Sequence, residues 1–491
     1  MRVALATALT LVLAASARAD VLVPADPAPP ARPPAGVSAA RDLIAFGRSG
    51  SGDVFASGRR VRFAGEAPQV AAAADGTAIV VTRYARSVLA RVRRGGRFGK
   101  TVRVGGAARL VRLAAAPGGW TAVAWLDGLA RRLSVAVVDP KGHVRRTVLE
   151  RARDIPPPAI GIDGSGHTTV AWTRNGTVRF ARGDAGKRWT QSRLTASAAP
   201  EAGLAVAPGG HWLLAWAARD RVRATLDGGP PQTLAPGRAP GTPAPAVNDD
   251  GTALVAYPDD FQVFAVDRVA NGPWTLPHRI SGDPQPRGGT GADSTVSSAL
   301  AADGRAVVAW PAERTTAASG RAGGAWAAAQ ALSSPLRIAD PPLAALDAAG
   351  VPFVLWVEIT QSTLEGRVHG ARLVPDVPLD TTPPKLTAKL PDRVDVARNG
   401  AFAFRVPVAC DEACDVRVDV YNANGKGARY ELRELSLPAG GSATVRLSPS
   451  PYDERTEVRL ERPKRMQILV RAADRAGNVA SASVTARVQR R

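Results

Sequence analysis

The sequence has little of what many enzymes and membrane proteins need. It has two cysteines and five histidines, and only 5% of its residues are aromatic. The histidines are scattered, so they show no spacing typical of a zinc site. The Gly-x-Ser-x-Gly, Walker-type and His-Glu-x-x-His patterns of common hydrolases and nucleotide-binding enzymes are also missing. Beyond the N-terminus, no apolar run reaches the ~20 residues that span a bilayer.

Lysine is scarce as well, with seven lysines among 64 basic residues in a chain of net charge +21. Excess positive charge favours non-specific attraction to nucleic acid, anionic polysaccharides or lipid headgroups. A high ratio of arginine to lysine also arises from coding bias alone. We therefore do not expect nucleic acid as a partner on the basis of charge.

Glycine and proline are abundant by contrast, with 48 and 40 residues in a chain of 491. This composition favours many turns over long helices, and a hydrophobic content of 45% is typical of a globular protein. The glycines have no period of three, which excludes a collagen-like chain. The length predicts two or three domains.

Residues 1–19 have the features of a secretory signal peptide. Arg2 supplies a positive charge, residues 4–15 are apolar, and Ala17-Arg18-Ala19 fits the small-x-small cleavage rule. An uncleaved anchor helix is the alternative. Cleavage would leave a secreted chain without a transmembrane segment, beginning at Asp20 with a Pro- and Ala-rich, exposed leader over residues 20–40.

The two cysteines, Cys410 and Cys414, are separated by three residues. In an exported protein such a close pair is expected to form a disulfide, which can bridge a tight turn between strands. A metal site would need further ligands, and a redox role would better suit a Cys-x-x-Cys spacing. We therefore predict a disulfide, with no resident metal and no cofactor.

A repeat with a mean length of about 46 residues dominates the chain from residue 41 to residue 375. Each unit has a turn glycine and an aliphatic residue four positions later, and six of the seven units have Trp or Tyr six positions later. The glycines are Gly76, Gly119, Gly166, Gly210, Gly251, Gly304 and Gly350. Successive strand residues point to opposite faces, so this apolar strand must be covered from both sides.

Each repeat has room for three further strands. An apolar stretch precedes the glycine, a more polar strand follows the aromatic residue, and a second glycine–aromatic–aliphatic pattern marks the fourth strand. Four strands in such a length are typical of one propeller blade. We predict an all-β fold with a closed β-propeller of seven blades over residues 41–375, with six or eight blades as alternatives.

Closure of the ring would need strands from outside the seven repeats. We expect strands within Asp53–Phe63 to complete the last blade, which would leave no free sheet edge. An open solenoid is the alternative, and it would need capping repeats at its ends.

The C-terminal fifth of the chain has a different pattern. Residues 376–384 predict a linker, and residues 385–491 alternate between apolar and polar side chains with a period of two. About seven short strands in this length predict a β-sandwich.

Two resemblances follow from these residues. Asp380-Thr381-Thr382-Pro383-Pro384, the cysteine pair and Ala472-Ala473-Asp474-Arg475-Ala476-Gly477-Asn478 are similar to bacterial immunoglobulin-like modules, which implies a spacer or adhesion role. The repeat region resembles secreted bacterial propellers of the sialidase-like superfamily. The Asp-box of sialidases, Ser-x-Asp-x-Gly-x-Thr-Trp, is not matched, since residues 163–168 share only part of it.

Sialidases use a tyrosine nucleophile, a glutamate, an acidic proton donor and an arginine cluster. The repeat region contains two tyrosines, Tyr84 and Tyr257. Tyr257 stands where other repeats have Trp, so we expect it to pack in a core. Tyr84 lies between Arg83 and Arg86, a setting that would suit a nucleophile, but exposed strand-end tyrosines are common. We assign no catalytic residue.

Three other groups could bind ligands. The pairs Asp249-Asp250 and Asp259-Asp260 offer oxygen ligands for calcium, or they simply form turns. The repeated tryptophans are expected to pack between blades rather than to stack on sugars. The stretch Arg83–Arg112 contains ten basic residues that could line one face and attract anionic wall polymers, or could form a solvated edge without a partner.

The sequence therefore favours a secreted, non-enzymatic binding or adhesion protein, whose propeller face recognises a glycan, an anionic wall polymer or a protein. The alternative is a sialidase-like glycoside hydrolase. A third hypothesis is an assembly scaffold that binds proteins only.

Overall fold

The structure of the chain is a computed structural model. It describes all residues except 1–18, 25–36, 41–42, 49–50, 57–58, 65, 85, 128–130, 195–197, 238–239, 261, 283–294, 313–314, 323, 340, 348, 361–365, 378–379, 397–401, 424–428, 449–451, 454–457, 460–463 and 491. The described chain is all-β, with 44 strands and one short 3-10 turn at Pro117–Gly119. The predicted signal peptide lies outside the described residues except for Ala19. The part of the chain that the structure describes contains no helix long and apolar enough to cross a membrane.

Between Ala19 and Val377 the strands form eight separate antiparallel sheets of four or five strands. Sheet 1 contains β2 (Val37–Ala40), β3 (Leu43–Arg48), β4 (Ser51–Ala56) and β5 (Arg59–Ala64). Sheet 2 contains β6 (Glu66–Ala72), β7 (Ala78–Tyr84), β8 (Ser87–Arg94), β9 (Arg97–Phe98) and β10 (Val102–Gly105). Sheet 3 contains β11 (Leu110–Ala115), β12 (Thr121–Leu126), β13 (Arg132–Val138) and β14 (Val144–Arg151). Sheet 4 contains β15 (Ala159–Ile162), β16 (His167–Arg174), β17 (Thr177–Asp184) and β18 (Arg188–Leu194).

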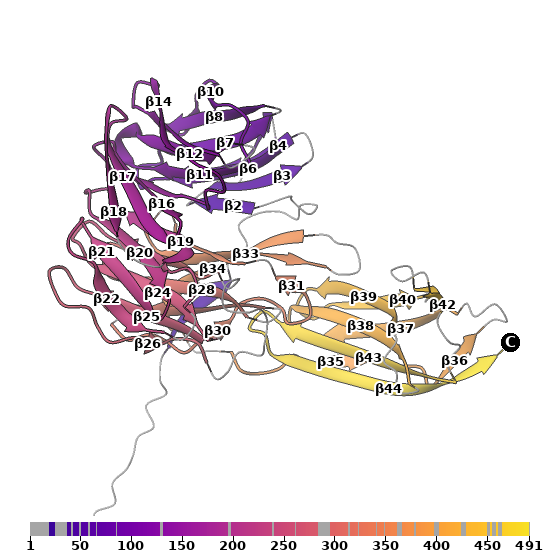
Figure 1. The fold of residues 1–491 in the computed structure, drawn as a ribbon. Coiled ribbons are helices and arrows are strands. Elements are labelled where there is room, and N and C mark those ends of the chain that lie inside the picture. Colours follow the sequence, from indigo (N-terminus) through magenta and orange to yellow (C-terminus); the bar gives the residue numbers. More distant parts are fainter. Residues whose placement is uncertain are drawn as a thin grey trace, which may run out of the picture.

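The remaining four sheets follow the same order along the chain (Figure 1). Sheet 5 contains β19 (Ala198–Val206), β20 (Trp212–Ala218), β21 (Arg221–Leu226) and β22 (Gln232–Pro236). Sheet 6 contains β23 (Ala244–Val247), β24 (Ala253–Asp259), β25 (Gln262–Arg268) and β26 (His278–Arg279). Sheet 7 contains β27 (Ser297–Leu300), β28 (Ala306–Ala312), β29 (Thr315–Arg321) and β30 (Gln330–Ala331). Sheet 8 contains β31 (Ile338–Ala339), β32 (Leu343–Leu346), β33 (Pro352–Ile359), β34 (Gly366–Val377) and, from the other end of the chain, β1 (Ala19–Pro24).

The repeated glycine lies in the turn between the first two strands of sheets 2 to 7, and between β32 and β33 in sheet 8. All seven glycines have a positive φ, between 75° and 103°, which is a conformation that residues with a Cβ rarely adopt. In every repeat, the residue three positions before the glycine donates its N–H to the carbonyl of the residue after it, as Ala73 does to Thr77 and Ala301 does to Arg305. The conserved spacing of the repeat is therefore the spacing of one hairpin turn.

The strand after each turn is buried on both faces, as its composition predicted. All six residues of β12 and all seven of β20 are buried. Each pair of consecutive sheets shares one apolar cluster, from sheets 1 and 2 to sheets 7 and 8. The aromatic residue of the repeat lies in these clusters, with Trp172, Trp216 and Trp310 at most 1% exposed. Packing between neighbouring sheets is thus what the repeat encodes.

The structure corrects two predictions about the N-terminal strands. Residues 53–63 do not join the last sheet, because they form β4 and β5 of sheet 1, which has no counterpart among the seven repeats. The leader expected over residues 20–40 also contributes strands, since β1 pairs with β34 and β2 pairs with β3. Eight sheets are therefore described, a number that was given as an alternative to the seven predicted.

The C-terminal residues form two further sheets around one core. One sheet has the order β35 (Leu386–Ala388), β37 (Phe404–Cys410) and β40 (Ser442–Leu447). The other has the order β36 (Arg393–Val396), β44 (Val479–Arg490), β43 (Arg465–Asp474), β38 (Cys414–Asn422) and β39 (Arg429–Leu437). A short pair, β41 (Tyr452–Asp453) and β42 (Val458–Arg459), lies apart from them. Alternate residues of both sheets, such as Val406, Val418 and Ile468, fill the shared core. A disulfide joins Cys410 at the end of β37 to Cys414 at the start of β38.

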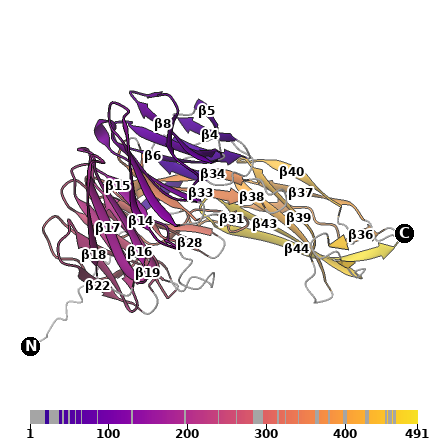
Figure 2. The same cartoon turned by 45° about the horizontal axis from the view of Figure 1, so that its top comes forward.

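The C-terminal sheets pack against sheet 8, as Figures 1 and 2 show for β31 and β38. Arg337, which is 4% exposed, crosses this junction from the residue before β31. Its Nη2 donates to Asp415 Oδ1 at 2.6 Å and to Ser436 Oγ at 2.7 Å. Arg417 donates in the opposite direction, to the carbonyl oxygen of Leu336 at 3.3 Å. Because a buried guanidinium needs oxygen partners to offset its desolvation, these contacts link sheet 8 to the C-terminal sheets.

Candidate functional site

The two tyrosines of the repeat region lie in different environments. Tyr257 is 2% exposed and stacks on Phe264, with ring centroids 5.5 Å apart. Burial, followed by the negative charge of Asp259, raises the pKa of Tyr257 far above its usual value. This tyrosine is therefore a packing residue, in the position of the tryptophan of other repeats. Tyr84 is 53% exposed at the end of β7 and faces Ser87 across the hairpin.

The two aspartate pairs of sheet 6 cannot share one ion. Asp249 and Asp250 precede β24, whereas Asp259 ends it and Asp260 follows it. Seven residues of strand separate the pairs by roughly 20 Å. Hydrogen bonds from Thr252 hold the pKa of Asp250 below its usual value. Asp250 thus closes a turn, which was the simpler of the two predictions.

The basic stretch of residues 83–112 does not form one surface. Arg94 donates to the carbonyl oxygens of Gly119 and Asp139 in sheet 3, at 3.1 and 2.8 Å. Arg91 lies over the rings of Phe63 and Phe98, with its guanidinium carbon 5.0 and 5.7 Å from the ring centroids. These arginines join sheets and cover aromatic rings. Arg103 is different, because it opens onto a pocket.

This pocket, called here the arginine pocket, lies between β10 of sheet 2 and strands β12, β13 and β14 of sheet 3. Its volume is about 460 Å³. Its lining includes three exposed arginines, Arg103, Arg132 and Arg146, together with Trp125 and Val148. Among the described lining residues there is no acidic side chain. The pocket therefore concentrates positive charge on a concave surface that has an apolar floor.

The geometry of two hairpins positions the pocket arginines. Arg132 and Ser134 are two residues apart on β13, and Arg146 and Val148 are two residues apart on β14. Side chains two apart share a face of the sheet, so all four point to the same side as Trp125, which pairs with Ser134. Arg132 and Arg146 were not predicted from the sequence, because they lie outside the basic stretch. The only sequence signal was this alternation of arginine with a small or apolar residue.

Arg146 is held by the neighbouring sheet. Its Nε donates to the carbonyl oxygen of Val104 at 2.9 Å, and its Nη2 donates to that of Arg103 at 2.5 Å. A guanidinium has five N–H groups, so others are left for a ligand. The exposed guanidinium groups of Arg103, Arg132 and Arg146 suit the paired oxygen atoms of carboxylates and phosphates.

The floor of the pocket depends on one close contact. A Cβ on Gly105 would lie 2.8 Å from two ring atoms of Trp125, which is closer than carbon atoms approach without displacement. The absence of a side chain at Gly105 therefore lets β10 lie directly on the indole ring. Trp125 remains 7% exposed at the pocket floor.

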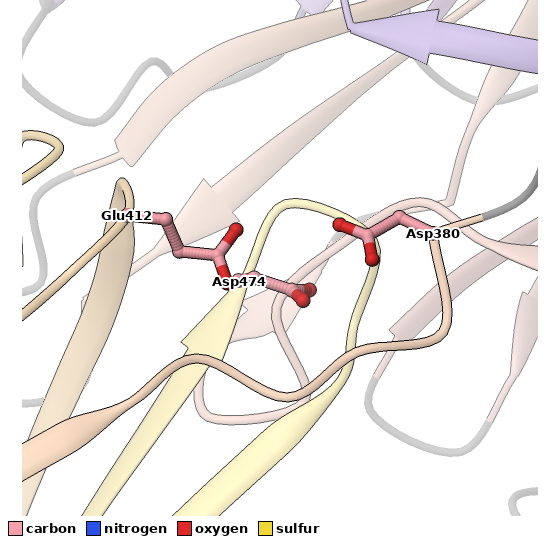
Figure 3. A group of neighbouring side chains, drawn as sticks. All are labelled: Asp380, Glu412 and Asp474. Carbon is pink, nitrogen blue, oxygen red and sulfur yellow. The ribbon is translucent and has the colours of Figure 1, made fainter.

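A second polar group lies where the C-terminal sheets begin (Figure 3). One carboxylate oxygen from each of Asp380, Glu412 and Asp474 lies within 4.8 Å of the others. Burial, followed by the negative charges of Asp474 and Asp380, raises the pKa of Glu412. Oxygen ligands in this arrangement could hold a divalent cation. Asn478 already donates to both oxygens of Asp474, at 2.9 and 2.8 Å, so hydrogen bonding alone also accounts for that residue.

A small cavity of about 140 Å³ lies at the junction of sheet 8 with the C-terminal sheets. Glu358 and His369 line it, and Glu358 accepts hydrogen bonds from Trp356 Nε1 at 3.1 Å and from Ser334 N at 3.0 Å. Because the carboxylate of Glu358 is engaged by these groups, it supports the junction.

Comparison with known proteins gives weak similarities only. No protein-family model matches the chain, and no curated protein matches it. A protein of unknown function from Desulfotomaculum acetoxidans is similar over 55% of this chain and 88% of its own, with 12% identity and a TM-score of 0.38. A Lactobacillus plantarum protein is similar over 74% of this chain and 96% of its own, with 12% identity and a TM-score of 0.35. Puromycin hydrolase is similar over 69% of this chain and 58% of its own, with 15% identity and a TM-score of 0.36. TM-scores below 0.5 assign neither a fold family nor an activity.

Proposed function

We propose that this chain is an exported binding protein that recognises an anionic polymer at the arginine pocket. The observation that carries the proposal is the pocket itself, which presents three arginines and the edge of Trp125 with no acidic side chain among its described lining residues. Acidic polysaccharides and phosphate-containing wall polymers offer the oxygen atoms that guanidinium groups bind in pairs.

The proposal includes a closed propeller of eight blades. Its support is a series of contacts that joins one strand from each sheet to one strand of the next. The strands, in order, are β2, β6, β11, β15, β19, β23, β27 and β32, and β32 also contacts β2. The pairing of β1 with β34 joins the N-terminal strand to the last sheet. A closed ring would cover the outer faces of the first and last sheets, leave only short, protected edges, and hold sheets 2 and 3 at the distance that shapes the pocket.

The proposal also includes export and an immunoglobulin-like C-terminal module of the spacer or adhesion type. The disulfide between Cys410 and Cys414 supports export, since disulfides persist in oxidising compartments. Two sheets around one core support the module. The predicted cleavage after Ala19 would keep Asp20–Pro24 of β1 in the mature chain.

The test is the binding of polygalacturonate by the mature chain, measured by calorimetry beside neutral dextran at several salt concentrations. We expect binding of polygalacturonate only, with an affinity that falls as salt rises. The double variant Arg103→Gln/Arg132→Gln should lose about tenfold in affinity, because two charge-assisted contacts are removed. Arg145→Gln/Arg188→Gln removes the same charge from exposed positions elsewhere and should change affinity by less than about threefold.

Equal losses in the two double variants would show that net charge alone attracts the polymer, and would overturn the proposal. Binding of dextran with the same affinity would favour recognition of a neutral glycan. Shortening of the polymer by the protein would instead support the hydrolase alternative.

A further inference from the structure

A third cavity, which shares no lining residue with the arginine pocket, lies where one strand from each of seven sheets ends. This strand-end cavity has a volume of about 540 Å³. Residues at the C-terminal ends of β6, β11, β15, β19, β23, β27 and β32 line it. No other cavity described above collects residues from so many sheets, because this one lies where the hairpin turns of the repeat converge.

Most of the wall is apolar. Ile162, Val206, Val247, Leu300 and Leu346 contribute one branched side chain each from five different sheets. Alanines and prolines of the neighbouring turns fill the space between them. Such a wall favours an aliphatic group over a charged or strongly hydrated one.

The polar side chains gather in two adjacent turns of sheets 6 and 7. Asp303 pairs with Arg305, whose Nε donates to Asp303 Oδ2 at 2.6 Å, so these two charges cancel. Asp249 accepts a hydrogen bond from the backbone N–H of Gly209 at 2.6 Å. Within the described residues, no cationic partner of Asp249 is present. The cavity therefore has one net negative charge, although the whole chain has a net charge of +21.

Asn248 provides the independent observation. It lines the cavity and is 6% exposed. Its Nδ2 donates to the carbonyl oxygens of Ala301 and Ala302 at 3.3 and 3.4 Å, which fixes the orientation of the amide. Its Oδ1 is buried and has no hydrogen-bond partner among the described residues. A buried acceptor without a donor is unfavourable, so this oxygen marks a place in the cavity wall where a donating ligand would be favoured.

We propose that the strand-end cavity binds an aliphatic primary ammonium ion. The ammonium group has three N–H donors and no acceptor, which matches the unpaired Oδ1 of Asn248 and the carboxylate of Asp249. The alkyl chain lies against the apolar wall. A carboxylate would be repelled by Asp249, and an alcohol would satisfy Asn248 without gaining from the charge. This site is separate from the arginine pocket, and it does not depend on the anionic polymer.

The test uses calorimetry on the full mature chain with three six-carbon probes, which are hexylammonium, hexan-1-ol and hexanoate. We expect hexylammonium to bind at least about tenfold more tightly than the other two probes, because it alone can form a charge-assisted hydrogen bond with Asp249.

The variants test which residues cause this preference. Asp249→Asn keeps an oxygen for Gly209 N and should reduce the preference for hexylammonium by about tenfold. Ala302→Leu, which adds bulk at an exposed turn of the lining, should weaken all three probes. Asp220→Asn, an exposed aspartate paired with Arg221 in another turn, is the matched control and should bind like the wild type.

Three results would overturn the proposal: no binding of hexylammonium at millimolar concentration by folded protein, equal binding of hexanoate, or an unchanged preference in Asp249→Asn. The variant Arg103→Gln/Arg132→Gln should leave hexylammonium binding unchanged. Failure of the arginine pocket as a polymer site is thus measured separately from failure of this one.

Discussion

At the scale of single residues, arginine has two roles in this protein that the sequence does not distinguish. Arg94, Arg146 and Arg337 each donate to backbone or side-chain oxygens of a neighbouring sheet. Arg103 and Arg132 are exposed at a pocket. All of them look alike in a chain with 57 arginines. Which role an arginine has depends on the sheet it faces, and that contact is formed between segments far apart in sequence.

Glu412 gives a prediction about pH. Burial and neighbouring carboxylates raise its pKa in the folded protein, so the native state holds this proton to a higher pH than the unfolded chain does. The free energy of unfolding therefore falls as pH rises from the ordinary glutamate pKa through the raised one. Glu412→Gln should raise the melting temperature at about pH 8, well above the ordinary glutamate pKa, because the raised pKa of Glu412 costs stability there, and should lose that advantage at about pH 3.5, below the ordinary pKa.

Melting curves in a chelating buffer measure this effect without a bound cation. Asp392→Asn removes an exposed carboxylate outside the cluster and serves as the control. A variant that is less stable than the wild type at about pH 8 in chelator would contradict the assigned repulsion.

At the scale of elements, the hairpin turn was predictable and the ends of the array were not. The turn has a local cause, because one glycine at a positive φ recurs at a fixed distance from a buried strand. Sheet 1 lacks the glycine–aromatic spacing, so the strands predicted within Asp53–Phe63 were assigned to the last sheet rather than to a sheet of their own. The strand β1 was hidden in a segment rich in proline and alanine, since its partner β34 lies about 350 residues away along the chain.

Contacts between neighbouring sheets also give a prediction. Glu150 of β14 accepts hydrogen bonds from Arg174 and Arg179 of sheet 4, both at 2.9 Å, and its side chain is 10% exposed. Glu150→Ala leaves two partly buried guanidinium groups without a carboxylate, so unfolding by urea should show a loss of about 2 kcal/mol. Asp220→Ala breaks the exposed pair with Arg221 and should change the free energy of unfolding much less, because solvent screens that pair. Similar small losses in both variants would mean that the ion pairs of Glu150 do not stabilise the contact between sheets 3 and 4.

At the scale of the whole molecule, the sequence predicted an all-β chain with many four-stranded sheets and a C-terminal part with its own core. It did not predict the junction between them, because Arg337 is 78 residues from Asp415 and 99 residues from Ser436 in the sequence. The two proposed ligand sites have the same origin. Each lies between sheets, so each requires the sheets to be arranged as the proposed ring arranges them.

Cross-linking of β1 to β34 tests that ring most directly. Val21 pairs with Val374, and paired Cα atoms of antiparallel strands lie about 4.5–5.5 Å apart, within the range of a disulfide. In the mature chain, Val21→Cys/Val374→Cys should form an intramolecular disulfide on mild oxidation, detected as a linked peptide by mass spectrometry. Val21→Cys/Val368→Cys places the second cysteine about 20 Å further along the same strand, so this variant should not form the intramolecular disulfide. Equal linkage in the two variants, or none in a folded Val21→Cys/Val374→Cys protein, would contradict the closed ring.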